Sequence, residues 1–321
     1  MSKNEAQLRK TLARIAELAG ASGNGGYSES HDDHDHEIDA DGVIVCVPKA
    51  LPQRLQLKAA ETAREINPVN APQFSPFAAL SATAIMGPQA IAILTTKYWG
   101  PSARRLTVSF METTAANLRA RILSHMNAWS RTAGISFVET QSTGQIRISR
   151  AGSGYWSYLG TDVLHIPTNR PTMNLQGFTM NTPESEYKRV VRHETGHTLG
   201  MPHEHMRKAL IARLDRQKTY DYFRQSFGWD KATVDAQVLT SLDEASLMAT
   251  PPDQTSIMCY QLPGSITRDG QPIIGGTDIN ATDFAFAGKV YPKAGHSVSM
   301  AVAGDSDDWD ESEDVEAAYP S

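Results

Sequence analysis

The stretch RVVRHETGHTLGMPHEH, residues 189–205, decides the fold of this chain because it combines a helical pattern with fixed spacings of histidine. His193 and His197 are four residues apart, so a helix places both imidazoles on one face with their Cβ atoms about 5–6 Å apart. Two imidazoles on one helix face can bind the same metal ion. The alternative is a pair of unrelated surface histidines, which needs no further pattern around it.

Flanking residues mark both ends of this helix. Upstream, Thr182, Pro183 and Glu184 predict a capped start, with proline at the first helical position and an acid in the first turn. Downstream, Gly200 can adopt the left-handed conformation that ends a helix, and Pro202 prevents the helix from resuming. The chain is therefore expected to turn back just before a third histidine.

That histidine is His203, and it completes a set of three nitrogen ligands that leaves a fourth position open for water or substrate. A third histidine at one fixed offset arises by coincidence in roughly 3% of cases, given the ten histidines of this chain. Glu194 lies one step from the first ligand, where it can hold a metal-bound water instead of the metal. The sequence predicts one Zn²⁺ bound by His193, His197 and His203, with Glu194 as the general base.

Regular elements surround the zinc motif on both sides. Alternating or short apolar runs predict strands at four places, residues 105–111, 135–140, 145–150 and 163–167. Helical periodicity and helix-start signals predict three further helices, at residues 114–132, 213–240 and 278–292. Strands interleaved with helices indicate a layered α/β core.

Composition excludes several classes of protein. Hydrophobic residues make up 40% of the chain and charged residues 21%, as in soluble globular proteins. No apolar run is long enough to span a membrane, and there is no basic stripe for nucleic acid. The first 20 residues lack the apolar core of a secretory signal, which favours a cytoplasmic location, with non-classical export as the alternative. Two cysteines, Cys46 and Cys259, are too few for a disulfide framework, and we expect two reduced, buried thiols.

Two motifs together resemble those of a known group of enzymes. The spacing HExxHxxGxxH of residues 193–203 is similar to the long zinc motif of metzincin metalloproteases, and SIMCY, residues 256–260, resembles the Met-turn beneath their metal. Glu204, Arg207 and a tyrosine two residues after the methionine resemble the astacin family in particular. The segment GSGYWSYLG, residues 152–160, is also similar to the astacin segment that precedes the active-site edge strand.

The resemblance covers roughly residues 91–293 and implies an α+β, metzincin-like catalytic domain. In that fold a twisted, mostly parallel sheet and the zinc helix lie above a cleft, and a mainly helical C-terminal subdomain lies below it. The resemblance further implies that Met258 packs under the three histidines and that Tyr260 is a displaceable zinc ligand that can stabilise an oxyanion. The alternative for Tyr260 is a core tyrosine near the metal.

The implied function is a zinc metalloendopeptidase, a hydrolase that cleaves protein or peptide substrates by Glu-assisted attack of a zinc-bound water. We expect the substrate to lie extended along an edge strand near residues 163–167. The alternative is a catalytically silent zinc-holding binding or interaction protein on the same fold. The presence of Glu194 argues against it, because such a protein could dispense with that residue. Neither nucleic acid nor membrane is an expected partner, and the oligomeric state is not indicated.

Three parts of the chain are expected. Residues 1–90 form an N-terminal extension or pro-segment with a flexible linker at residues 20–41, residues 91–300 form the protease domain, and residues 301–321 form an acidic disordered tail. Cys46 in the extension either caps the zinc as a thiolate or is a small apolar residue of a strand. Glu204 either anchors a new N-terminus, once about 90 residues are removed, or pairs with a cation within the fold.

Overall fold

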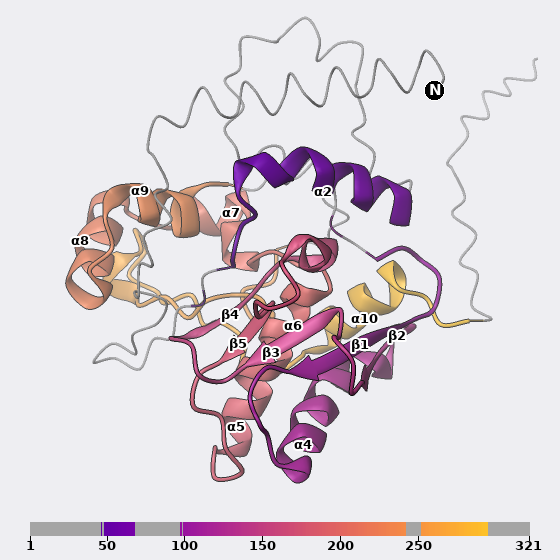
Figure 1. Ribbon diagram of the computed structural model, residues 1–321. Coiled ribbons are helices and arrows are strands. Elements are labelled where there is room, and N and C mark those ends of the chain that lie inside the picture. The colour runs from indigo at the N-terminus through magenta and orange to yellow at the C-terminus, as the bar shows by residue number, and fades with distance from the viewer. Residues whose placement is uncertain (1–45, 47, 68–96, 98, 242–251, 295–321) are drawn as a thin grey trace, which may run out of the picture.

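The computed structural model describes residues 46, 48–67, 97, 99–241 and 252–294 (Figure 1). The expected linker at residues 20–41 and the acidic tail at residues 301–321 lie outside the described residues, so the division into three parts stays a prediction. None of the helices in the described ranges combines the length and the apolar character that a membrane span needs.

Five strands form one sheet in the order β2-β1-β3-β5-β4. They are β1 (Arg104–Phe110), β2 (Ile135–Glu139), β3 (Ile146–Ser149), β4 (Tyr155–Ser157) and β5 (Met173–Leu175). Every neighbouring pair is parallel except β4 with β5, which is antiparallel. The expected mostly parallel sheet is confirmed, and the first three predicted strands are β1, β2 and β3.

The predicted strand at residues 163–167 is wrong, because these residues belong to a 3₁₀ helix, η4 (Gly160–His165), and the bend after it. Gly160 opens this helix with φ 46°, and a Cβ there would lie 1.8 Å from the Lys97 carbonyl oxygen. Val163 is buried in the core, whereas Leu164 is 39% exposed. A buried residue next to an exposed one occurs in short helices as well as in strands, so the sequence pattern did not separate the two. The antiparallel edge strand is β4, not this segment.

The predicted helix at residues 114–132 is observed as α4 (Ala116–Met126), continued by a 3₁₀ turn, η3 (Asn127–Arg131). Its apolar face is buried as expected, at Leu118, Ile122, Met126 and Trp129. The Trp129 indole Nε1 donates to the Arg192 carbonyl oxygen at 2.8 Å. This hydrogen bond joins the buried face of α4 and η3 to the helix that carries the zinc motif.

The zinc-motif helix consists of α5 (Glu184–Glu186), a π-helical segment η5 (Tyr187–Val191) and α6 (Arg192–Thr198). It begins one residue later than predicted, with Pro183 at the N-cap and no side-chain cap. The Thr182 hydroxyl instead accepts a hydrogen bond from the Thr179 backbone N–H at 3.0 Å. Gly200 adopts φ 91° just after the helix, so the predicted left-handed turn is confirmed.

A second apolar core lies in the C-terminal part, around Phe223, Phe227 and Trp229. The described helices that follow His203 in the chain are η6 (Glu204–Met206), α7 (Lys208–Ile211), α8 (Arg216–Phe227), α9 (Lys231–Val234), η7 (Asp235–Leu239), η9 (Gly264–Ile266) and α10 (Ala281–Val290), and α10 packs against the main core instead. Asn280 and Asp283 form a reciprocal capping box at the start of α10. The predicted helices at residues 213–240 and 278–292 are confirmed, as is the mainly helical lower subdomain.

One helix of the expected N-terminal extension, α2 (Gln53–Ile66), lies across the part of the chain that contains the sheet, at the top of Figure 1. Leu51 and Ala59 from this region form a small apolar cluster with Ile166. Just before the helix, the Lys49 backbone N–H donates to the Ser157 carbonyl oxygen at 3.1 Å, and Lys49 pairs with Tyr158 in the parallel sense. The extension therefore contacts the edge of the sheet beside β4.

Candidate active site

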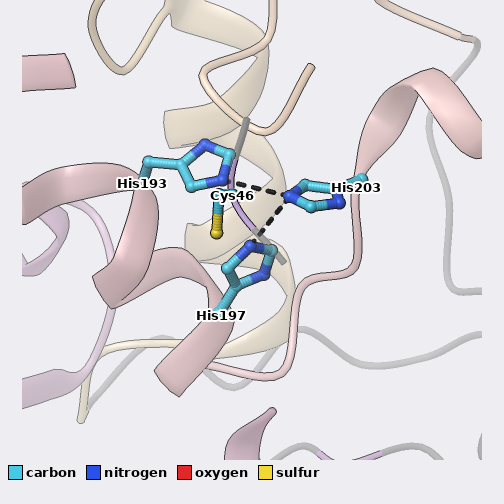
Figure 2. A group of neighbouring side chains, drawn as sticks. All are labelled: Cys46, His193, His197 and His203. Carbon is cyan, nitrogen blue, oxygen red and sulfur yellow. Dashed lines mark hydrogen bonds between the residues drawn. The ribbon is translucent and has the colours of Figure 1, made fainter. Parts of the chain in front are cut away.

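The three motif histidines point toward one another (Figure 2). His193 and His197 come from α6, and His203 comes from the turn before η6. The His203 Nε2 atom lies 3.2 Å from His193 Nε2 and 3.1 Å from His197 Nε2. All three side chains are buried. The structure thus brings together the three residues that the sequence selects as metal ligands.

Local backbone geometry explains why the third histidine returns to the helix. The Gly200 N–H donates to the His197 carbonyl oxygen at 2.7 Å, and the Met201 N–H donates to the Gly196 carbonyl oxygen at 3.0 Å. These two bonds close the helix end around a left-handed glycine. Pro202 cannot donate a further helical bond. His203 is consequently directed back over the face that carries the other two rings.

Backbone carbonyls orient two of the rings. His193 Nδ1 lies 2.6 Å from the Ile257 carbonyl oxygen, and His197 Nδ1 lies 2.8 Å from the Met201 carbonyl oxygen. A carbonyl can only accept, so each Nδ1 carries the hydrogen and each Nε2 presents a lone pair. Burial lowers the pKa of His193 to about 4 and that of His197 well below its usual range, which keeps both rings neutral.

Lone pairs that face one another in a buried space repel unless a cation lies between them. Three converging imidazoles, two of them with carbonyl partners on their far nitrogens, match the donor set and outer hydrogen bonding of a catalytic zinc site. The residues present therefore fit a single Zn²⁺. The carbonyl partners contributed by Ile257 and Met201 were not identifiable from the sequence, because a backbone oxygen carries no residue signature.

The Met-turn lies directly under the zinc helix. A Cβ placed on Gly196 would be 2.3 Å from the Met258 sulfur, so helix and turn are in close contact at a glycine. The Glu204 N–H donates to the Met258 carbonyl oxygen at 2.8 Å. Asp283 fixes the turn from below, accepting from the Ser256 hydroxyl at 2.6 Å and the Ile257 N–H at 2.9 Å. Met258 thus packs beneath the histidines, as the family resemblance implied.

Glu194 is the acidic group of the site. Its side chain is 1% exposed, and burial raises its pKa to about 8, against smaller lowering effects of Cys46 and Arg189. Within the described part of the chain, its Oε2 atom has no hydrogen-bond partner. A buried carboxylate with a free oxygen beside three metal ligands is placed to exchange a proton with a reacting water.

Cys46 is the fourth group at the centre. One ligand atom from each of Cys46, His193, His197 and His203 can be chosen so that all four lie within 4.8 Å of one another (Figure 2). The thiol is buried, and burial first and Glu194 second raise its pKa well above the usual range. Cys259 is buried and reduced elsewhere in the turn, so the expected pair of free thiols is confirmed.

Tyr260 completes the site. Its ring is stacked on His205, with centroids 4.1 Å apart and planes at 19°, and is tilted against His203 at 4.3 Å and 52°. Burial, and then the neighbouring Cys46 and Glu194, hold the pKa of its hydroxyl well above the usual range. The structure places this phenol next to a metal ligand, where both its expected catalytic role and a core role are geometrically available.

A small cavity opens beside the histidines and contains one residue that the sequence reading missed. Arg189 lines it together with Val190, Ile257 and Gly276. The Arg189 guanidinium pairs with both oxygens of Glu186, at 2.7 Å and 3.2 Å. Arg189 precedes His193 by four residues, so helical spacing alone could have placed it on the metal-facing side.

Glu204 forms an ion pair within the fold. The Arg207 guanidinium lies 3.2 Å from its carboxylate, and the Asp253 N–H donates to the same oxygen at 3.2 Å. Burial raises the pKa of Glu204 to about 7. In this state Glu204 is a cation partner, the second of the two roles expected for it, and its contact with a new N-terminus stays a prediction.

The mostly parallel sheet, the three-histidine helix and the Met-turn together define a metzincin-type zinc metallopeptidase. The family model of the astacin peptidases matches residues 93–274, more than half of the chain, and the chain belongs to this family.

Individual proteins are similar to parts of this chain. The zinc metalloproteinase nas-27 of Caenorhabditis elegans is 29% identical over 99 residues, which are 31% of this chain and only 21% of that protein's length. Among solved structures, myroilysin is similar with a TM-score of 0.58 and 33% identity, over 61% of this chain and 96% of that one. A hatching enzyme zinc-protease from the medaka fish Oryzias latipes is 20% identical, over 59% of this chain and 90% of that one, with a TM-score of 0.41.

Proposed function

We propose that this protein is a zinc-dependent endopeptidase in which Glu194 transfers the proton needed for peptide-bond hydrolysis. The observation that carries the proposal is the buried Glu194 carboxylate beside three converging imidazole nitrogens. Bound zinc would lower the pKa of a water molecule and polarise the scissile carbonyl. Glu194 would accept a proton from the attacking water and deliver it to the leaving amine.

Burial suits Glu194 to the first half of this task. Burial raises the pKa of the Glu194 carboxyl, so its carboxylate is a stronger proton acceptor than an exposed glutamate. Tyr260 is proposed to donate its hydroxyl hydrogen to the oxyanion that develops on the substrate carbonyl. Its position against His203 supports this role.

The substrate is proposed to bind as an extended strand along β4 rather than along residues 163–167. One edge of β4 pairs with β5, and the other edge lies at the end of the sheet. The Ser157 carbonyl oxygen on this strand already accepts a backbone hydrogen bond from Lys49 of the N-terminal extension. A peptide that reaches the metal site could use the same backbone groups.

Glu194→Gln separates an enzyme from a silent zinc-holding protein. The variant is measured in a chain that carries Cys46→Ser, so that Cys46 cannot cap the metal, and it keeps the shape of the Glu194 side chain. We expect one zinc per chain by atomic absorption and a loss of casein cleavage of at least about 100-fold relative to Cys46→Ser alone. The matched control is Glu139→Gln, the same change at a surface ion pair with Arg119, which should leave cleavage unchanged. Casein cleavage that is undiminished in Glu194→Gln would contradict the proposal.

We also propose that the intact chain is latent, with the Cys46 sulfur occupying the fourth zinc position. Thiolate sulfur is a strong zinc ligand, and its buried place among the three imidazoles supports coordination. The segment after Cys46 lies on the β4 edge through Lys49, so it blocks the proposed substrate strand as well. One contact would exclude water from the metal and the other would exclude the peptide.

Thiol reactivity tests this latency without relying on activity. In the zinc-loaded full chain we expect Cys46 to resist alkylation, and chelation of the zinc should expose it to the reagent. Cys46→Ser should raise the casein cleavage of the intact chain, whereas the control Cys259→Ser, at the other buried thiol, should not. Equal alkylation of Cys46 with and without zinc, together with unchanged cleavage by Cys46→Ser, would rule out the cap.

A further inference from the structure

His205 is buried next to the metal site but is not among the converging ligand atoms found in the described residues. Its imidazole lies nearly parallel to the Tyr260 ring, at 19°, with a centroid distance of 4.1 Å. The third ring of the group is His203, whose centroid is 5.1 Å from His205 and 4.3 Å from Tyr260. Three rings thus form one cluster, and only one of them belongs to the ligand set.

His205 is itself held from a different element. Its Nε2 atom lies 3.1 Å from the Gln237 carbonyl oxygen in η7, which makes Nε2 the donor of that bond. The side chain is 0% exposed, so its ring cannot turn away from the tyrosine into solvent. The orientation of the imidazole is therefore set by the lower subdomain and does not depend on a bound metal.

Tyr260 needs such a support because the polar group beside its hydroxyl is the Cys46 backbone, which belongs to the N-terminal segment and not to the part of the chain that holds the ring. Within the described residues, this hydroxyl makes no hydrogen bond to another side chain. A phenol that is to meet a developing oxyanion has to keep its ring plane while the hydroxyl shifts by a small distance. A flat ring stacked on it permits sliding within the plane and resists tilting out of it.

We propose that His205 is a positioning residue that sets the plane of the Tyr260 ring through stacking, and so places the Tyr260 hydroxyl for the reaction. The inference rests on the proposed function, because it assigns His205 a role only through Tyr260. The Tyr260 hydroxyl acts in the transition state more than in substrate binding. Loss of the stacked His205 ring should therefore lower kcat and leave KM nearly unchanged.

The test compares His205→Phe with His205→Leu in the full-length chain carrying Cys46→Ser. Both substitutions remove the donor to the Gln237 carbonyl oxygen, and only phenylalanine keeps a flat ring. We expect kcat of His205→Leu to fall about two- to tenfold below that of His205→Phe, with KM values within about twofold. A tetrahedral phosphinic peptide, measured by calorimetry on zinc-loaded protein, should lose affinity for His205→Leu by a similar factor.

Tyr260→Phe in the same background makes the comparison specific. Tyr260→Phe removes the hydroxyl that His205 is proposed to position. In that background, the kcat values of His205→Leu and His205→Phe should therefore differ by less than twofold. The inference would be overturned if kcat differed between His205→Leu and His205→Phe by the same factor with and without Tyr260→Phe. It would also be overturned if the two variants had equal kcat while Tyr260 is present. An unchanged kcat in Tyr260→Phe alone would overturn it as well. If the parent cleaves no casein, the proposed function fails, while the phosphinate affinities still compare the two variants.

His125→Ala is a control for general loss of packing. His125 is another buried histidine that contacts a tyrosine ring, Tyr187, at a centroid distance of 5.0 Å. It lies on α4, away from the metal ligands. His125→Ala should lower the melting temperature. It should not change the factor by which Tyr260→Phe lowers kcat. A change in that factor would mean that the assay reports stability and would overturn the specific role of His205.

Discussion

Gly276→Ala should disturb the metal site through a contact that lies outside the zinc motif. Gly276 packs against the Met-turn, where an added Cβ would lie 2.3 Å from the Ser256 carbonyl oxygen and 2.4 Å from the Ile257 nitrogen. Its φ lies outside the left-handed region, so space, and not backbone strain, is the obstacle. Both neighbouring atoms belong to the backbone, so a rotamer change cannot relieve the clash.

The expected cost follows from how far the turn must move. Restoring an ordinary contact requires a shift of about 1 Å of the peptide between Ser256 and Ile257. Overpacking of this kind costs about 1–3 kcal/mol, and the lower chain entropy of unfolded alanine offsets about 0.4–1 kcal/mol. A net loss of about 1–2 kcal/mol corresponds to a fall in Tm of about 2–8 °C for a domain of this size.

The same shift should weaken zinc binding. The Ile257 carbonyl oxygen accepts the hydrogen bond from His193 Nδ1 at 2.6 Å, and losing such an outer partner typically costs about 10- to 100-fold in metal affinity. Competition with a chromophoric chelator measures the zinc Kd, and differential scanning calorimetry measures Tm. The control is Gly288→Ala in α10, where the nearest atom would be Thr132 Cβ at 3.3 Å and little change is expected. Unchanged Tm and zinc Kd in Gly276→Ala would refute this reasoning.

Three further outcomes are expected. Met258→Ala should cost about 2–5 kcal/mol because the side chain is buried, whereas Met258→Leu should cost less than about 1.5 kcal/mol; urea unfolding would contradict this if the two were equal. Zinc at 100 times its Kd should stabilise the fold by about 2.7 kcal/mol, and a Tm that does not respond to a chelator would exclude a folded-state metal site. Burial chiefly lowers the pKa of His125, so the unfolded chain binds more protons near its ordinary value of about 6.5 and stability falls as pH drops through that value. His125→Phe should therefore lose less stability than the parent between pH 7 and pH 5, and an identical loss would contradict the assignment.

Local spacing made the metal ligands readable from the sequence. His193 and His197 are one helical turn apart, and Gly200 supplies the one backbone conformation that returns His203 to them. These relations span eleven residues and depend on helix geometry alone. The strands β1 to β3 were readable for a similar reason, since each one carries its own apolar pattern.

Contacts between distant residues were not readable in the same way. The Ile257 carbonyl is 64 residues from the histidine that it orients, and any residue could supply that oxygen. The stacking of His205 on Tyr260 joins two turns that no local pattern relates. The error at residues 163–167 has another cause. The five-residue segment VLHIP is too short for its apolar residues to separate the strand pattern from the helix pattern, and only the neighbour that it packs against decides.

Tyr260 and Cys46, the two groups beside the three histidines, differ in what holds them in place. Tyr260 is buried against His203 and His205, which belong to the same part of the chain as the metal ligands, so its place does not depend on the N-terminal segment. Cys46 packs in the second apolar core, and the residues that follow it are held by the hydrogen bond of Lys49 to β4 and by the small cluster around Leu51. While that segment is covalently attached, its effective concentration is about millimolar, so even weak packing can keep the thiol on the metal. Removing residues 1–90 would turn the same contacts into binding of a separate peptide, which dilution dissociates. Under the proposed latency, activation therefore requires no rearrangement of the three histidines.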